Sequence, residues 1–103
     1  MGVYRFEDLR VWQAARKQCD EVEQINSASI SVMNNISEGF LRHRDKEFLQ
    51  FLRVAAGSNG EVRSCLYSAQ DRRHISQEEA ARLIEASNVI GRMIRRLQDT
   101  LEK

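Results

Sequence analysis

The sequence predicts an all-α fold: a bundle of long antiparallel helices forming a single domain over residues 1–103. The chain contains no proline and only five glycines, so tight turns must be few. Its apolar residues recur at alternating steps of three and four, which places them along one face of a helix. The length also suits one domain with its own core.

The first expected helix begins near Asp8, and its apolar side consists of Leu9, Val11, Trp12, Ala15 and Cys19. No glycine or proline marks a turn between this apolar side and Glu38. The pattern alone therefore leaves two alternatives open. One is a single helix of roughly 30 residues, about 45 Å long, within a bundle of three long helices. The other is a break near Val22 and four helices.

The stretch NNISEGF, Asn34 to Phe40, ends the next helical pattern with a group of polar residues. Gly39 stands where a glycine in the left-handed conformation ends many helices, so we expect it to end this one. Glu38 gains nothing from the dipole at that end and therefore predicts a specific partner, such as an arginine. The apolar face of this helix comprises Val22, Ile25, Ser29, Val32 and Ile36.

The third expected helix starts at Asp45 as N-cap, and a second apolar stripe of Phe51, Val54, Ser58 and Cys65 predicts a wide buried face. Its period continues through AAGSNGEV, residues 55–62, which predicts one unbroken helix. The small residues Gly57, Ser58 and Gly60 would let another backbone approach closely, within the bundle or between subunits. The main apolar seam comprises Phe48, Leu52, Ala55, Asn59, Val62, Leu66 and Ala69.

The fourth expected helix runs from about Gln77 to about Leu101, after a turn over RRHIS, residues 72–76. Ser76 and Glu79 form the pattern of a capping box at its start. Its heptad seam comprises Ala80, Leu83, Ser87, Ile90, Ile94, Leu97 and Leu101.

The charge balance alone points to no partner, because the formal net charge is only +1. Thirteen of the sixteen basic residues are arginine, which binds phosphate and carboxylate through paired hydrogen bonds. Codon usage in a GC-rich genome explains this choice at least as well. Cys19 and Cys65 fall at apolar helix positions without the spacing of a metal or redox site, which predicts reduced core cysteines of a cytoplasmic protein. No apolar segment suggests a secretory signal or membrane contact.

Catalytic residues are not evident, so we expect no enzyme activity, no cofactor and no metal. His43 and His74 flank arginines near expected helix ends and fit exposed turn residues. No serine, histidine and acid arrangement, phosphate-binding glycine loop or metal-ligand spacing is recognisable.

Binding is the more plausible role, because three arginine-containing groups could meet phosphates. The competing interpretation is a solvated surface with local ion pairs, such as Glu85 with Arg92 and Arg95 with Asp99. Trp12, Phe48 and Phe51 fit the core, so base stacking is not expected. The candidate nucleic-acid-binding residues are Arg42, Arg44 and Lys46, then Arg72 and Arg73, and finally Arg92 and Arg96.

Three blocks of the chain resemble the four-helix-bundle proteins encoded in intervening sequences of bacterial 23S ribosomal RNA genes. They are FEDLRVWQAA (6–15), QINSASISVMNNISEGF (24–40) and EFLQFLRVAAGSNGEV (47–62). The second block resembles the family signature S-I-P-x-N-I-A-E-G through Asn35, Ile36, Glu38 and Gly39. Met33 replaces the usual proline of that signature, and Ser37 replaces its alanine. The segment that normally joins the first two helices is missing near Val22.

This resemblance implies an up-and-down antiparallel four-helix bundle and favours the break near Val22. It places NNISEGF at a helix-to-helix corner, where we hypothesise that Asn35 and Glu38 fix the corner by hydrogen bonding, or that Glu38 contacts a partner. The resemblance also implies a ring-like homo-oligomer, a pentamer, that binds RNA or DNA. The alternative is a protein-interaction scaffold, or an accessory subunit for a reverse transcriptase or RNA-processing partner.

Overall fold

Four α-helices fill the part of the chain that the computed structural model describes, which is residues 5–19 and 25–102. A short 3-10 helix, η1 (Phe6–Asp8), leads into α1 (Arg10–Cys19), and α2 (Asn26–Leu41), α3 (Asp45–Asp71) and α4 (Gln77–Leu101) follow. No strand occurs within those two ranges. The predicted all-α class is therefore confirmed, and α4 has the bounds that its heptad seam predicted.

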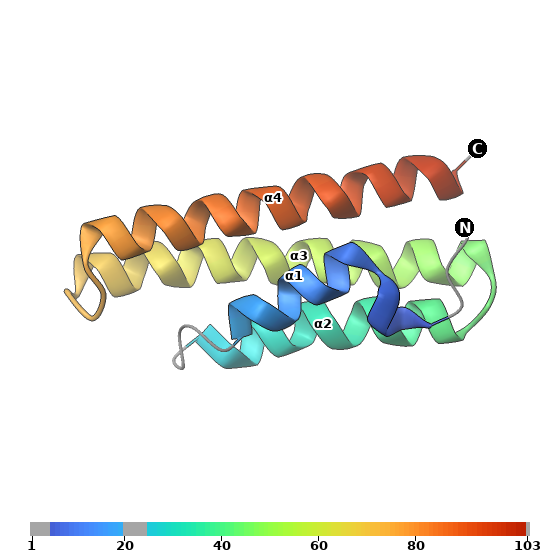
Figure 1. Ribbon diagram of the computed structural model, residues 1–103, viewed down its shortest axis with the longest axis horizontal. Helices are drawn as coiled ribbons and strands as arrows, with labels where there is room; N and C mark the ends of the chain where they lie inside the picture. The colour runs from blue at the N-terminus through green and yellow to red at the C-terminus, as the bar shows by residue number, and fades with distance from the viewer. Residues whose placement is uncertain (1–4, 20–24, 103) are drawn as a thin grey trace.

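The helices run up and down, each antiparallel to the next, in an elongated bundle (Figure 1). The bundle measures 43 × 21 × 18 Å, which agrees with about 40 Å for the 27 residues of α3. Helix α1 packs against α2 and α4, while α3 also packs against both of these. Because α1 and α2 are separate antiparallel helices, the alternative of three long helices is wrong. Val22 itself lies outside the described residues.

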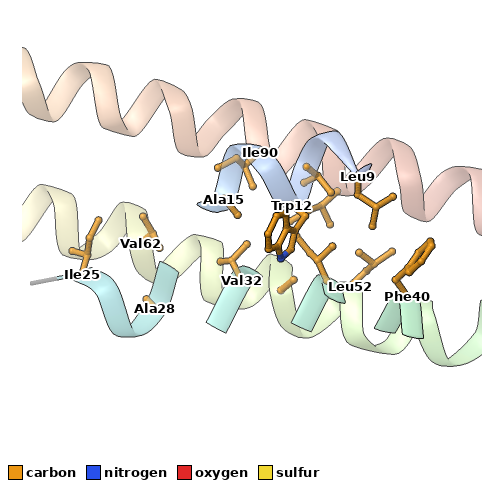
Figure 2. Close-up of a cluster of buried hydrophobic side chains, with 14 of the residues drawn as sticks. Leu9, Trp12, Ala15, Ile25, Ala28, Val32, Phe40, Leu52, Val62 and Ile90 are labelled. Carbon is orange, nitrogen blue, oxygen red and sulfur yellow. The ribbon is translucent and has the colours of Figure 1, made fainter. Parts of the chain in front are cut away.

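The core draws one apolar face from each helix, as Trp12, Val32, Leu52 and Ile90 illustrate (Figure 2). Every predicted seam residue of α3 is buried, and these are its only buried residues. The same holds for the α4 seam from Ala80 to Ile94, whereas Leu97 and Leu101 are partly buried. Burying one such aliphatic side chain contributes about 1.5–3 kcal/mol, so this shared face holds the four helices together.

A polar pair, Asn59 of α3 and Ser87 of α4, interrupts the apolar core, and both residues are buried. Asn59 Nδ2 donates to the Ser87 carbonyl over 2.9 Å, and the Ser87 hydroxyl donates back to Asn59 Oδ1 over 2.9 Å. Arg63 Nη1 donates to the same hydroxyl oxygen over 3.3 Å. Because unpaired polar groups are costly inside a protein, this exchange fixes the register of α3 against α4.

The helix ends follow the predictions only in part. Ser76 caps α4 as predicted, accepting a hydrogen bond from the Glu79 backbone N–H over 3.0 Å. The predicted N-cap at Asp45 is wrong, because Arg44 occupies that position and Asp45 is the first residue of α3. Its carboxylate still suits the first turn, where the helix dipole favours negative charge.

Gly39 does not end α2, so that prediction is also wrong. The helix continues to Leu41, and no described glycine has a positive φ. Two non-glycine residues take the left-handed conformation instead: His43 after α2, with φ 59°, and Arg73 after α3, with φ 61°. After α3 the backbone closes with bonds from His74 N to Ala69 O, 2.9 Å, and from Arg73 N to Gln70 O, 3.0 Å. This is the Schellman arrangement.

The second stripe of α3 is not the buried face that the sequence predicted. Val54 and Cys65 are exposed, while Phe51 and Ser58 are half-buried. Cys65 is therefore no core cysteine, and the side chain of Cys19 lies outside the described residues. The stripe lies beside α2, which covers only part of it.

Within the described ranges, none of the helices has the length and apolarity needed to cross a membrane.

Candidate nucleic-acid interface

The polar residues of NNISEGF bond mainly within α2. Asn35 Nδ2 donates to the Ser31 carbonyl over 2.8 Å and to the Ser31 hydroxyl over 3.2 Å. That hydroxyl meets the Ser58 hydroxyl of α3 at 2.8 Å. Asn35 therefore reaches α3 only through Ser31, a link that the sequence did not reveal.

Glu38 has the arginine partner that its position predicted. Arg42 Nη2 lies 2.8 Å from Glu38 Oε1, one turn further along the helix. The same guanidinium lies over the ring of Phe51 in α3, 5.2 Å from its centroid. Both charged side chains are about half exposed, so the ion pair itself contributes only about 0.3–0.5 kcal/mol. Its main effect is to hold Arg42 across the corner between α2 and α3.

The α2–α3 corner gathers exposed basic side chains: Arg42, His43, Arg44 and Lys46. Arg44 lies 3.8 Å from Glu47, whereas Lys46 has no ion pair among the described residues. Phe51 lines a groove of about 300 Å³ here, together with Arg42, Glu47, Gln50 and Val54. The prediction that Phe51 belongs to the core holds only in part, because its ring is half-buried and lies under Arg42.

The α3–α4 corner presents Arg72, Arg73 and His74, all exposed. Neither arginine forms an ion pair within the described part of the chain. Their backbone is fixed by the hydrogen bonds that close α3, so both charges sit on an ordered turn. This corner lies at the opposite end of the bundle from the α2–α3 corner, as the up-and-down order predicted (Figure 1).

The arginines of α4 divide between two environments. Arg92 pairs with Glu85 at 3.2 Å, and Arg95 pairs with Asp99 at 3.4 Å. Both ion pairs were predicted as the alternative to phosphate binding, and both are confirmed. Arg96 instead lines a groove that Arg10 also lines. The seven predicted basic residues therefore form two corners and one flank, not a single patch.

The three small residues predicted to pack against a neighbour differ in their surroundings. A Cβ atom added to Gly57 would meet nothing within 4 Å, and one added to Gly60 would meet only the Arg63 side chain at 3.8 Å. Ser58 already bonds to Ser31. The bundle itself therefore requires no glycine at positions 57 and 60, and both stay available for a contact between chains.

Replacing Gly57 with alanine is expected to raise the free energy of unfolding of the single chain by about 1 kcal/mol, because alanine favours the helix and meets no neighbour. Thermal unfolding at low protein concentration measures this gain. Light scattering at high concentration measures assembly. If the chains of an oligomer contact each other at Gly57, the Gly57→Ala oligomer should dissociate and its molar mass should fall. If they contact each other elsewhere, the molar mass should not change.

Replacing Arg73 with glycine is expected to stabilise the protein by about 0.5–1 kcal/mol, because glycine adopts the left-handed conformation without steric cost. His43→Gly should give a similar gain at the other corner, since the two φ angles are nearly equal. Chemical denaturation of both variants measures the effect. A loss of stability in Arg73→Gly would mean that the arginine side chain, and not the backbone, holds the turn.

Neither histidine has surroundings that point to catalysis. His43 and His74 are exposed at the two corners, as turn residues would be. No group of three or more histidine, cysteine, aspartate or glutamate side chains is arranged to hold a metal ion within residues 5–19 and 25–102.

The chain belongs to a known protein family. A family model described as 23S rRNA-intervening sequence protein matches residues 20–96, more than half of the chain. The matched range includes α2, α3 and most of α4, with both arginine corners. No curated protein and no solved structure matches the chain.

Proposed function

We propose that this protein is a non-catalytic helical bundle that binds nucleic acid, and RNA in particular, through arginine-rich surfaces of a homo-oligomer. The observation that carries the proposal is the α3–α4 corner, where Arg72 and Arg73 are adjacent, exposed and without ion pairs in the described chain. Arginine can bind one phosphate through two parallel hydrogen bonds. Two such side chains on an ordered turn form a local phosphate site even though the net charge is only +1.

The α2–α3 corner would supply the second contact. Arg42 and Arg44 each have a carboxylate neighbour, so a phosphate must compete with Glu38 and Glu47. Phe51 offers one half-buried ring next to Arg42, enough to contact a single unpaired base but not to read a sequence. Recognition of phosphates and RNA shape is therefore expected to dominate.

Assembly of several chains would raise the affinity. One corner with two arginines binds weakly by itself, whereas symmetric repetition presents several copies to one nucleic-acid molecule. The open surface at Gly57 supports packing between chains. A pentamer is the assembly that the family resemblance suggests.

The experiment is a binding titration with an RNA hairpin, single-stranded RNA and duplex DNA at several salt concentrations. The double variant Arg72→Gln/Arg73→Gln is compared with Arg53→Gln/Arg95→Gln, which removes two exposed arginines elsewhere. The corner variant should bind more weakly. The slope of log K against log salt concentration should become less steep by about 0.7–0.9 for each phosphate that the variant no longer neutralises. Equal weakening in both variants would show that overall charge matters and this corner does not.

A further inference from the structure

A groove between α1 and α4 has an apolar floor and two charged rims. Its volume is about 410 Å³. The floor consists of Leu9 and Val11 on one side and of Val89, Met93 and Leu97 of α4 on the other. Arg10 lies at the α1 rim and Arg96 at the α4 rim. Its α4 residues lie between the middle of that helix and its C-terminal end, away from the α3–α4 corner.

The groove leaves apolar surface of α4 uncovered beside the first residues of α1. Helix α1 has 10 residues and α4 has 25, so α1 covers only part of the α4 face turned toward it. Val89 remains 39 % exposed, and four other apolar residues line the groove with it. Covering these side chains would be favourable by roughly 25 cal/mol for each Å² of apolar surface removed from water.

The charges on the rims define what the groove would accept. Arg10 and Arg96 are exposed, and neither forms an ion pair within the described residues. The neighbouring arginines of α4 differ, because Arg92 and Arg95 are both paired with carboxylates. The groove thus has apolar side chains between two arginines that have no ion pair in the described chain. It complements a ligand whose apolar groups are flanked by carboxylates.

We propose that this groove binds an amphipathic helix of a partner protein, with aliphatic side chains on the floor and glutamate or aspartate against Arg10 and Arg96. Two helices form the walls and present side-chain ridges without a free strand edge, a geometry suited to a third helix. Nucleic acid fits less well, because a phosphate backbone would contact the two arginines and leave the five apolar lining residues uncovered. The site is separate from the proposed RNA corner, so either can fail without the other.

The test measures fluorescence anisotropy with a labelled synthetic helix that has leucine at positions i, i+3, i+4 and i+7 and glutamate on both flanks. Two matched peptides carry lysine on the flanks or the same residues in scrambled order. The glutamate peptide should bind at least about tenfold more tightly than either control. Val89→Asp should weaken its binding about tenfold or more, a loss of roughly 1.4 kcal/mol. Ile30→Asp changes a similarly exposed apolar residue of α2 outside the groove and should leave binding unchanged.

A charge reversal makes the test specific to the rims. Arg10→Glu/Arg96→Glu should reverse the preference so that the lysine peptide binds more tightly than the glutamate peptide. Equal binding of the glutamate and scrambled peptides would overturn the proposal, as would equal weakening in Val89→Asp and Ile30→Asp. Dissociation of the oligomer by Val89→Asp, with no peptide bound to the wild type, would assign the groove to a second copy of this chain. Displacement of the peptide by RNA at the groove would likewise overturn the partner proposed here.

Discussion

Replacing Gly39 with alanine is expected to lower the free energy of unfolding by about 2 kcal/mol, even though alanine is the better helix former. An added Cβ atom would lie 2.7 Å from Cβ of Phe51 and 2.9 Å from Cδ1 of Phe48. Cβ of Phe51 is fixed to the backbone, so α2 and α3 must move apart. Overpacking of this kind typically costs about 1–3 kcal/mol. Because two long helices must move apart, we expect a cost at the upper end of this range. That cost outweighs the gain of about 1 kcal/mol from the higher helix propensity of alanine.

Gly57→Ala is the matched control, because it makes the same change inside a helix where no neighbouring atom lies within 4 Å. The two variants should therefore differ by about 3 kcal/mol in thermal or chemical unfolding of the single chain. Equal stabilities would contradict the account, since they would mean that α2 and α3 do not meet closely at Gly39. The glycine of the family signature would then need another explanation.

Replacing Asn59 with alanine is expected to lower the free energy of unfolding by about 2–3 kcal/mol. The change removes two buried hydrogen bonds to Ser87, both 2.9 Å long, and leaves a cavity beside Gly91. Removing a buried hydrogen-bond partner costs about 1–3 kcal/mol, and the cavity adds to that cost. Chemical denaturation measures the change, with Ser64→Ala as a control on the exposed side of α3.

A double-mutant cycle separates the Asn59–Ser87 pair from the cavity. Asn59→Ala, Ser87→Ala and the double variant should show a coupling of about 1 kcal/mol, because either single variant removes the bond from the Ser87 hydroxyl to Asn59 Oδ1. The bond from Asn59 Nδ2 to the Ser87 carbonyl does not depend on the Ser87 side chain. Additive losses would mean that the two residues stabilise the bundle independently. The hydrogen bonds would then not set the register of α3 against α4.

The apolar period of the sequence was enough to predict which residues face the core. All seven seam positions of α3 are buried. Residues spaced alternately by three and four lie on one face of a helix, and this apolar face packs against the other helices. Period also placed Asn59 and Ser87 in the core, although it did not reveal that they bond to each other. Ion pairs one or two turns apart, such as Arg95 with Asp99, follow from helix geometry alone.

The wrong predictions about helix ends concern residue types that can have more than one structural role. A glycine near a helix end can adopt a positive φ or admit a neighbouring helix, and only the packed structure shows that Gly39 does the second. The left-handed positions are instead occupied by His43 and Arg73. Histidine is enriched in that conformation and arginine is not, so the arginine position in particular could not be predicted from residue type. Arg10 and Arg96 come from distant parts of the chain, so their groove emerges only once α1 packs beside α4.

The most direct test of the proposed function compares wild type, Arg73→Gly and His43→Gly in an RNA-hairpin titration at low and physiological salt. Thermal unfolding is measured on the same samples. Both variants should be more stable than the wild type, yet Arg73→Gly should bind RNA more weakly and with a shallower salt dependence. The missing charge, and not a damaged fold, would then explain the weaker binding. Unchanged RNA affinity in Arg73→Gly, or no binding by the wild type at low salt, would contradict the account.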